Sequence, residues 1–253
     1  MPDPFRRCDF FLMDENSRMN SLIITLDAIE KPMVLPIAYQ HILQGLLYAA
    51  WKEALPSLHD DVAGTHLFTF SPLEGPCSVQ NRMIRFNSAL HFELRSPFDE
   101  LTQSVLKYCT AQETVRLGKN LLRVENLEIH NRMIFPDAAR IRMRGMVTVH
   151  ENQPDGSTRY YTPEDAEWLP RLRFMLKQKL HTLGMAADDR LEVGPLWRTL
   201  RKRVTSFKGT WITGYSGSFE IRCDPAAMAV LYYCGLGSRN SQGCGMFDIE
   251  NRE

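Results

Sequence analysis

Apolar and polar residues are arranged along the first half of the chain at spacings that favour short strands and helices. Residues 21–26 are apolar and β-branched enough for a buried strand. Residues 36–53 carry apolar side chains on one helical stripe and are bracketed by prolines, which predicts a core-facing helix. The rest of this half should form three short strands, a helix and a closing strand, at residues 67–70, 83–86, 90–94, 97–108 and 121–128.

The second half of the chain repeats this order. Its final helix has clear end signals, with Asp224 as N-cap, Pro225 as the first helical residue and Gly235 as the stop. Lys208 and Gly209 favour a turn between strands. The other expected elements are a strand, a hairpin turn with its return strand, a helix, two or three further strands and a closing strand, at residues 141–149, 154–157, 159–161, 163–183, 193–221 and 246–249.

The order strand, helix, two strands, helix, strand therefore occurs twice. This order predicts an α+β fold of two tandem ferredoxin-like (RRM-like) modules, each with its helices on one sheet face. We expect an N-terminal extension over residues 1–18, an N-terminal module over 19–130 and a C-terminal module over 131–253, the last with a glycine-rich loop at 235–245.

Composition narrows the class of protein. The 253 residues carry 30 basic and 30 acidic side chains, and no apolar run reaches the roughly 18 residues that a membrane span needs. The first residues lack a secretory signal, so we expect a cytoplasmic protein with six reduced cysteines. Cysteines, histidines and carboxylates show no metal-ligand spacing, so neither a metal nor another cofactor is predicted.

Basic residues are unevenly distributed despite the zero net charge. Residues 194–219 contain five cations and no acid, with Trp197, Phe207, Trp211 and Tyr215 interleaved. Residues 140–144 place three arginines at the alternate positions of one strand face. A basic stretch with interleaved aromatics is typical of a nucleic-acid-binding surface, and a solvated surface is the alternative. The five cations are Arg198, Arg201, Lys202, Arg203 and Lys208.

The glycine-rich loop is the most informative segment. It lies between a helix and a strand and lacks the Lys-Ser/Thr pair of a P-loop, which excludes the usual nucleotide-binding turns. Glycines permit positive φ and close approach of a ligand, which favours binding of a polyanionic backbone over a plain flexible connection. The candidate RNA-binding residues of this loop are Gly235, Gly237, Ser238, Arg239, Asn240, Ser241, Gly243 and Gly245.

Three segments together resemble one family, the CRISPR-associated repeat endoribonucleases that are number six in the Cas naming. The double Gly-x-Gly loop before the last strand is similar to the C-terminal signature of that family. Residues 35–48 and 66–71 resemble its first helix and the next strand. The resemblance implies two ferredoxin-like modules, cleavage of CRISPR repeat RNA in a precursor transcript to give guide RNAs, and no metal.

The resemblance also implies a site. In that family a ribose 2′-hydroxyl attacks the neighbouring phosphate and leaves a cyclic phosphate. The Tyr, His and Lys set of the family falls on Tyr48, His59 and His66, with histidine in place of the lysine. The resemblance also makes His41 a competitor of His59 for the role of general base, because some family members place the working histidine early in this helix. The shared helical face of His41, Gly45 and Tyr48 is consistent with that alternative. Packing or surface roles are the alternative for each, and Gly45 should admit close approach of RNA or of the glycine-rich loop.

The expected partners follow from the same resemblance. Residues 198–208 should form a hairpin that grips the repeat stem through its phosphates. Other CRISPR effector subunits and a second copy of the chain are further expected partners, whereas a membrane and direct DNA contact are not. The alternative function is a catalytically inactive repeat-RNA-binding subunit. An unrelated single-strand binder of the RRM type would need aromatic platforms that residues 140–144 lack.

Overall fold

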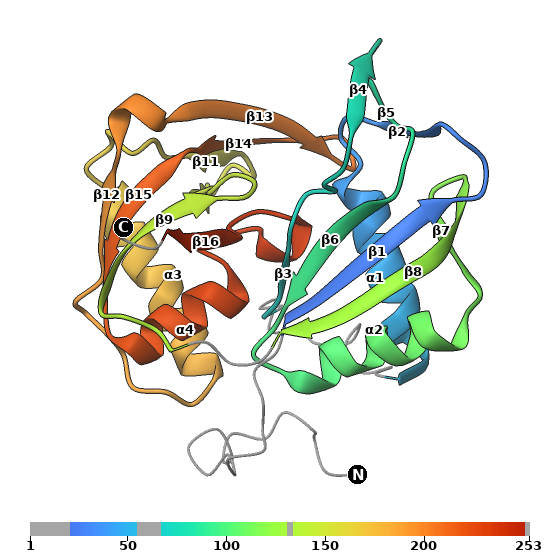
Figure 1. Cartoon of the computed structure of the whole chain (residues 1–253). Helices are drawn as coiled ribbons and strands as arrows, with labels where there is room; N and C mark the ends of the chain where they lie inside the picture. Colours follow the sequence, from blue (N-terminus) through green and yellow to red (C-terminus); the bar gives the residue numbers. More distant parts are fainter. Residues whose placement is uncertain (1–20, 55–66, 131–133, 251–253) are drawn as a thin grey trace.

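The computed structural model describes residues 21–54, 67–130 and 134–250. Two sheets lie side by side, and each has two helices on one of its faces (Figure 1). Each sheet is built from one half of the chain and has its own buried apolar cluster.

The N-terminal sheet has five strands in the order β3-β6-β1-β8-β7. Its core forms because alternate residues of the central strand, such as Leu22, Ile24 and Leu26, are fully buried against the two helices. The elements are β1 (Ser21–Ala28), α1 (Gln40–Ala54), β3 (Thr69–Phe70), β6 (Leu90–Arg95), α2 (Asp99–Ala111), β7 (Thr114–Leu117) and β8 (Asn120–His130). A separate three-stranded sheet is formed by β2 (Met33–Pro36), β4 (Cys77–Gln80) and β5 (Met83–Phe86).

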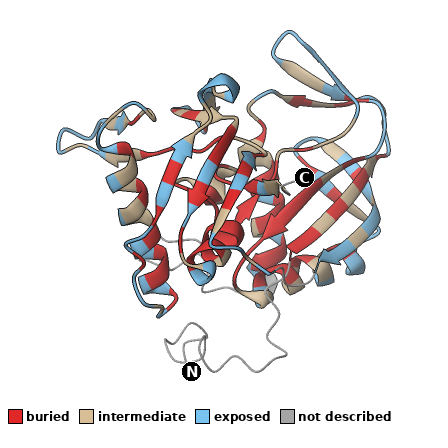
Figure 2. Cartoon of the chain, turned by 60° about the vertical axis from the view of Figure 1, so that its left-hand side comes forward, coloured by how far each residue is buried: buried red, intermediate tan, exposed pale blue. Residues whose placement is uncertain are grey.

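The C-terminal sheet has four strands in the order β12-β15-β9-β16. Buried and exposed residues alternate along its strands, as Figure 2 shows, and the buried ones face the helices. The elements are β9 (Ala138–Met143), α3 (Trp168–Thr182), β12 (Glu192–Pro195), β15 (Ser218–Arg222), α4 (Pro225–Cys234) and β16 (Phe247–Glu250). Two hairpins extend from it, β10 (His150–Asn152) with β11 (Thr158–Tyr160), and β13 (Arg201–Phe207) with β14 (Thr210–Ser216).

Both sheets place their strands in the same way. The first strand of each half is central, the last lies on one side of it, and the third and then the second lie on the other. Every pairing is antiparallel. This is the ferredoxin-like arrangement, so the predicted fold class is confirmed. The predicted domain limits stay a prediction, because residues 1–18 and 131–133 lie outside the described residues.

The structure places the ends of several predicted elements at other residues. The expected strand at 141–149 is wrong as one element, because β9 ends at Met143 and Val147 instead pairs with Tyr215 of the second hairpin. The helix expected from residue 36 begins at Gln40, since Pro36 belongs to β2. The helix expected from residue 163 begins at Trp168. Strands β2, β4 and β7 were not anticipated.

The predicted turn and helix-end residues agree with the structure better than the predicted strand and helix limits do. Lys208 and Gly209 both adopt positive φ between β13 and β14, as a tight hairpin turn requires. Helix α4 begins at Pro225 and is followed by Gly235 with φ of +86°. Asp224 occupies the N-cap position, but its carboxylate pairs with Arg190 instead of capping the helix.

A buried ionic network joins the two sheets. Arg95 of β6 is 2% exposed; its Nε donates to Glu93 Oε1 at 2.6 Å and its Nη1 donates to the Phe247 carbonyl of β16 at 2.6 Å. Its guanidinium also lies 3.8 Å from the centre of the Tyr232 ring on α4. Burial alone would raise the pKa of Glu93, but Arg95 and Arg144 hold that pKa below its usual value. The network therefore fixes one half of the molecule against the other.

Candidate active site and RNA interface

Helix α1 carries the candidate catalytic face. His41, Gly45 and Tyr48 follow one another at helical spacing on that face. Gly45 is exposed, and no described atom lies within 4 Å of the position that its Cβ would occupy. The expectation that the glycine-rich loop fills the space above Gly45 is therefore wrong, and the loop contacts the neighbouring Gln44 instead.

His41 lies where α1 meets the turn of the β13–β14 hairpin. Its ring centre is 6.2 Å from that of Phe207, with the two rings nearly perpendicular. Its Nδ1 is buried and has no hydrogen-bond partner among the described residues. The contact brings His41, the competing candidate for the base, close to the turn end of the basic hairpin, although His41 and Phe207 are 166 positions apart in the chain.

Tyr48 is half-buried two turns after His41 on α1. Its ring meets the rings of Trp51 and Phe68 edge-on, with centres 5.5 Å and 6.4 Å apart. Burial raises the pKa of Tyr48 above its usual value. The phenol therefore keeps its proton at neutral pH, as a proton donor must.

The other two catalytic candidates, His59 and His66, lie in the segment 55–66, outside the described residues. Their proposed roles stay predictions. The structure gives the position of α1 before this segment and of Leu67 and β3 after it.

Packing inside the protein explains why three positions of the loop are glycines. Gly235, Gly237 and Gly245 are buried and adopt positive φ. A Cβ on Gly235 or Gly245 would lie 2.5 Å or 2.2 Å from the Asn240 side-chain nitrogen, and a Cβ on Gly237 would lie 2.4 Å from a backbone oxygen. Asn240 itself is 7% exposed. These four residues pack the loop against the protein, so the interpretation that they let a ligand approach is wrong for them.

For the rest of the loop, RNA contact stays a prediction. Ser238, Arg239, Ser241 and Gly243 are partly exposed. Arg239 adopts a left-handed conformation with φ of +55°, which is rare for a residue with a side chain. A polyanion can reach this outer side of the loop, and we keep these four residues as candidates.

A histidine that the sequence did not single out anchors one end of the loop. The Nδ1 of His150 lies 2.7 Å from Ser238 Oγ. Burial and the positive charge of Arg239 lower the pKa of His150 to about 4, so the imidazole is neutral at pH 7. A single histidine at the start of a short strand gave no pattern by which the sequence could have revealed it.

The β13–β14 hairpin carries the predicted cations. Arg201, Lys202 and Arg203 follow in β13 and Lys208 lies in the turn, and these four are exposed. Arg201 and Arg203 point to one face of the hairpin and Lys202 to the other, because side chains alternate along a strand. Arg198 precedes β13 in a short 3-10 helix, Trp197–Thr199. None of the five makes an ion pair within the described ranges.

The aromatic residues of this region divide into two kinds. Trp197 and Trp211 are 55% and 64% exposed. Phe207 is buried, and the ring of Tyr215 lies edge-on to that of Trp168. The exposed pair is available to a ligand, whereas the other two hold the hairpin onto the molecule.

A cleft of about 640 Å³ lies between the two sheets. The segments that line it include the residues before and at the start of α1, Pro72 after β3, the end of β9 with the residues that follow it, the hairpin and the glycine-rich loop. Arg142, Arg201 and Arg203 line it together with the Gln40 and Gln242 amides. The cleft is therefore the place where the start of α1 meets the hairpin and the glycine-rich loop.

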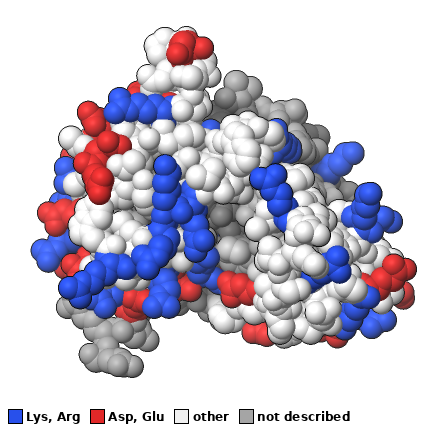
Figure 3. All heavy atoms as spheres, turned by 90° about the horizontal axis from the view of Figure 1, so that it is seen from above, with Lys and Arg blue, Asp and Glu red and all other residues white. Residues whose placement is uncertain are grey.

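The charge distribution agrees with this location. Seen from above, Lys and Arg side chains gather in a band over the half of the molecule that carries β13 and β14 (Figure 3). Arg142 pairs with Glu250 at 2.9 Å but remains 71% exposed. Arg144 is bound by Glu74 and Glu93, so it serves the contact between the sheets.

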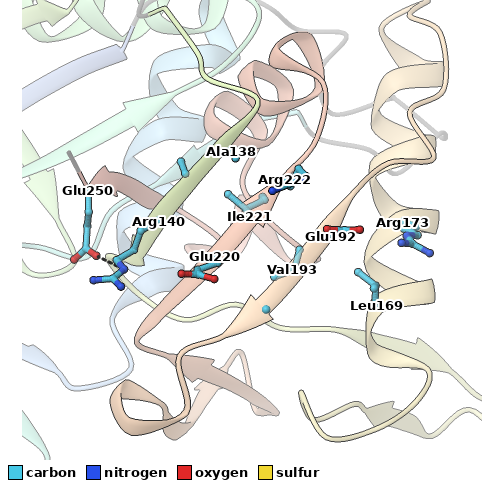
Figure 4. A pocket seen from close by; sticks show the side chains of 12 residues that line it. Ala138, Arg140, Leu169, Arg173, Glu192, Val193, Glu220, Ile221, Arg222 and Glu250 are labelled. Carbon is cyan, nitrogen blue, oxygen red and sulfur yellow. Dashed lines mark ion pairs between the residues drawn. The ribbon is translucent and has the colours of Figure 1, made fainter. Parts of the chain in front are cut away.

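A second cavity of about 950 Å³ covers the open face of the C-terminal sheet. Its charged side chains have both signs, as Figure 4 shows for β9, β15 and β12. Arg140 lies 4.0 Å from Glu250, and Glu220 and Glu192 lie on the neighbouring strands. The acids offset the cations, so this larger cavity suits a polyanion less than the cleft does.

Among the described residues, no group of three or more His, Cys, Asp or Glu side chains is placed to hold a metal ion. No helix within the described ranges has both the length and the apolar character needed to cross a membrane.

Comparison with solved structures defines the class of protein by fold. A Cas6-related protein from Pyrococcus furiosus aligns with a TM-score of 0.82 at 16% identity, over 93% of this chain and 100% of that chain. An RAMP protein described as binding different RNA substrates aligns at 0.81 and 14%, over 92% and 100%. A Cas6 product complex aligns at 0.64 and 17%, over 91% and 99%. The chain thus shares the tandem ferredoxin-like fold of these proteins.

A family model identifies the chain more closely. The model of the C-terminal region of the CRISPR-associated protein Cas6 matches residues 124–249, which contain the hairpin and the glycine-rich loop. No curated protein sequence matches the chain. The chain belongs to the Cas6 family, as the sequence resemblance implied.

Proposed function

We propose that this protein is an endoribonuclease that cleaves CRISPR repeat RNA in the precursor transcript to give mature guide RNAs. The observation that carries the proposal is that the start of α1, the basic hairpin and the glycine-rich loop meet at one cleft in a Cas6-family chain, with His41 in contact with Phe207 of the hairpin. Similar solved structures described as Cas6 product and substrate-mimic complexes support an RNA substrate.

The proposed reaction uses no metal. A general base takes the proton of a ribose 2′-hydroxyl, and its oxygen attacks the adjacent phosphorus. The bond from phosphorus to the 5′-oxygen breaks, the leaving oxygen takes a proton from a general acid, and a 2′,3′-cyclic phosphate remains. A cation or hydrogen-bond donor stabilises the charge on the five-coordinate phosphorus.

We assign roles by chemistry and location. His59 or His41 is the base, and His41 has the advantage of lying beside the hairpin. Tyr48 suits the acid, because a phenol can donate a proton at neutral pH and Tyr48 shares a helical face with His41. His66 takes the remaining role. Arg239 and Lys208 lie on the two segments that face α1, so either can offset phosphate charge.

We propose that two groups of residues contact two parts of the RNA. The cations of the hairpin bind the phosphates of the repeat stem, and Arg201 and Arg203 direct the strand into the cleft. Ser238, Arg239, Ser241 and Gly243 contact the backbone next to the cut. Other CRISPR effector subunits and a second copy of the chain remain proposed partners, in the cytoplasm and with no direct DNA contact.

The test is cleavage of a labelled CRISPR repeat RNA in EDTA by the wild type, His59→Ala and His41→Ala. RNAs with one 2′-deoxy substitution at each candidate position form a second set. We expect cleavage in EDTA that is lost with one deoxy position and falls about 10²- to 10⁴-fold with the variant that lacks the base. His181→Ala is the matched control, because His181 is exposed on α3.

A binding-only subunit is the second candidate. The packing of Tyr48 against Trp51 and Phe68 and the buried Nδ1 of His41 are what a structural role for these residues would produce. Tight binding of the repeat with no cleavage under any metal condition would establish this candidate. Absence of both binding and cleavage would contradict both functions.

A further inference from the structure

A buried lysine lies beneath the glycine-rich loop. Lys179 is in the last turn of α3, on the side that also buries Leu176 and Leu180, and it is 6% exposed. Its ammonium group donates to the carbonyls of Gly235 and Gly237, the latter at 3.0 Å. It donates also to Asn240 Oδ1 at 2.8 Å. The three hydrogens of an ammonium group are thus matched by three acceptors of one loop.

No carboxylate among the described residues forms an ion pair with Lys179. Burial lowers the pKa of Lys179 to about 8. Cys234 of α4 faces the same group, and burial raises the pKa of its thiol to about 12, so the thiol stays neutral over the working range. Within the described part of the chain, the hydrogen-bond acceptors of the ammonium group are all neutral groups of the loop. The charge is therefore sensitive to the position of the loop, and the position of the loop to the charge.

Asn240 extends this contact across the loop. While its Oδ1 accepts from Lys179, its Nδ2 donates to the carbonyls of Leu236 at 3.3 Å and of Cys244 at 3.1 Å. Gly235 and Gly245 leave room for this side chain, as their missing Cβ atoms show. Lys179 and Asn240, which we call the Lys179–Asn240 clasp, therefore tie both ends of the loop to α3.

The opposite side of the loop contacts the N-terminal half. Gln44 of α1 donates from Nε2 to the Ser241 carbonyl at 2.7 Å, and Thr69 of β3 donates to the Cys244 carbonyl at 3.1 Å. Gln44 lies on α1 between His41 and Tyr48. The loop held by the clasp is thus in direct contact with the helix that carries the candidate catalytic face.

We propose that Lys179 is a positioning residue, whose ammonium group fixes the glycine-rich loop and through it the register of α1 against the hairpin and Arg239. The inference rests on the proposed function for its effect on cleavage. Lys179 touches no RNA in this scheme, so its loss lowers the rate of the chemical step and leaves binding by the hairpin unchanged. Loss of one proton leaves two donors for three acceptors, so the loop loosens as Lys179 becomes neutral.

The experiment compares the wild type with Lys179→Met, which keeps the length of the side chain and removes all donors. Lys177→Met is the matched control, because Lys177 is exposed on the same helix. The first readout is the single-turnover cleavage rate at saturating enzyme, set against the Kd for the same RNA. We expect a rate loss of about 10- to 100-fold with a Kd within about twofold, since a misplacement of about 1 Å costs that much in rate.

Two more readouts separate positioning from a merely structural role. The wild type and Lys177→Met should lose cleavage above an apparent pKa near 8, and Lys179→Met should lack that limb of the pH profile. Hydrogen exchange at the loop amides of Leu236, Ser238 and Gly245, which donate to backbone carbonyls, should become faster in Lys179→Met alone. Cleavage and exchange equal to those of the wild type would overturn the proposal.

The exchange readout keeps the inference distinct from the proposed function. If the wild type cleaves no repeat RNA, the proposed function fails, while faster loop exchange in Lys179→Met still supports the clasp. If Lys179→Met does not fold, Asn240→Ser replaces it, because it removes the other half of the clasp and creates space instead of a clash. Unchanged loop exchange in Asn240→Ser would contradict the clasp.

Discussion

The glycine-rich loop and the β13–β14 hairpin illustrate two ways in which one cleft is built. The hairpin is exposed and holds its cations free of ion pairs within the described part of the chain. The loop is largely buried, and its polar groups are used by Lys179, Asn240 and Gln44. The hairpin is therefore suited to bind an external polyanion, whereas most of the loop holds the two halves of the molecule in register.

The glycines of the two segments show the same contrast. Gly209 in the hairpin turn and Gly245 in the loop have the same φ of +86°. Nothing lies within 4 Å of a Cβ built on Gly209, whereas a Cβ on Gly245 meets the Asn240 nitrogen and the Leu236 oxygen at 2.2 Å and 2.3 Å. One glycine is required by backbone conformation alone and the other by conformation and packing together.

The largest expected effect follows from that pair. Gly245→Ala should lower the free energy of unfolding by about 2–4 kcal/mol, through left-handed strain and forced displacement of Asn240. Gly209→Ala carries only the strain and should cost about 1–2 kcal/mol. Urea denaturation of the two variants beside the wild type measures both values. Equal losses would show that the loop has as much free space as the hairpin turn.

The next effect concerns the His150 anchor of the loop. Its pKa is about 4 in the folded protein, against an ordinary value of about 6.5. Between these values the unfolded chain binds a proton that the folded protein does not, so stability falls as pH drops from about 6.5 to about 4. After discounting for the partial exposure of His150, we expect a loss of about 1–2 kcal/mol in this window.

His150→Gln tests this pH dependence, because glutamine can still bond to Ser238 but does not titrate. Its stability should fall less than that of the wild type between pH 6.5 and pH 4, as measured by urea denaturation at each pH. His181→Gln, at an exposed position on α3, should follow the wild type. A His150→Gln variant with the full acid loss would assign that loss to other groups.

The sequence predicted the architecture because each half repeats one order of elements with clear turn and cap residues. The sequence alone predicted the roles of Pro225, Gly235 and the Lys208-Gly209 turn, because these residues act through local backbone geometry. The end of β9 at Met143 could not be predicted in this way, because it depends on the pairing of Val147 with Tyr215 on a distant strand. Long-range pairing overrides the local preference of an apolar segment.

The candidate site was less predictable than the fold. Residue type indicated the hairpin cations and the helix face with His41 and Tyr48. It did not indicate that the buried glycines of the loop are required by packing inside the protein. Their partner Lys179 lies 56 positions before Gly235, in a helix where lysine is ordinarily a surface residue. Only the packing of α3 under the loop shows that this lysine is buried, and no periodicity in the sequence indicates it.

The smallest effect on stability is expected at the hairpin, and it completes the comparison. Arg201→Ala combined with Arg203→Ala should change the free energy of unfolding by less than about 0.5 kcal/mol, because both side chains are exposed and form no ion pair with a described residue. The same variant should bind repeat RNA more weakly, and the slope of log Kd against log salt should become shallower by about 2, one for each lost cation. Arg116→Ala, at an exposed arginine of β7, is the control and should leave that slope unchanged. An unchanged slope in the double variant would show that these hairpin cations do not bind the RNA phosphates. The contrast between a hairpin that binds RNA and a loop that has a structural role would then be wrong for the hairpin.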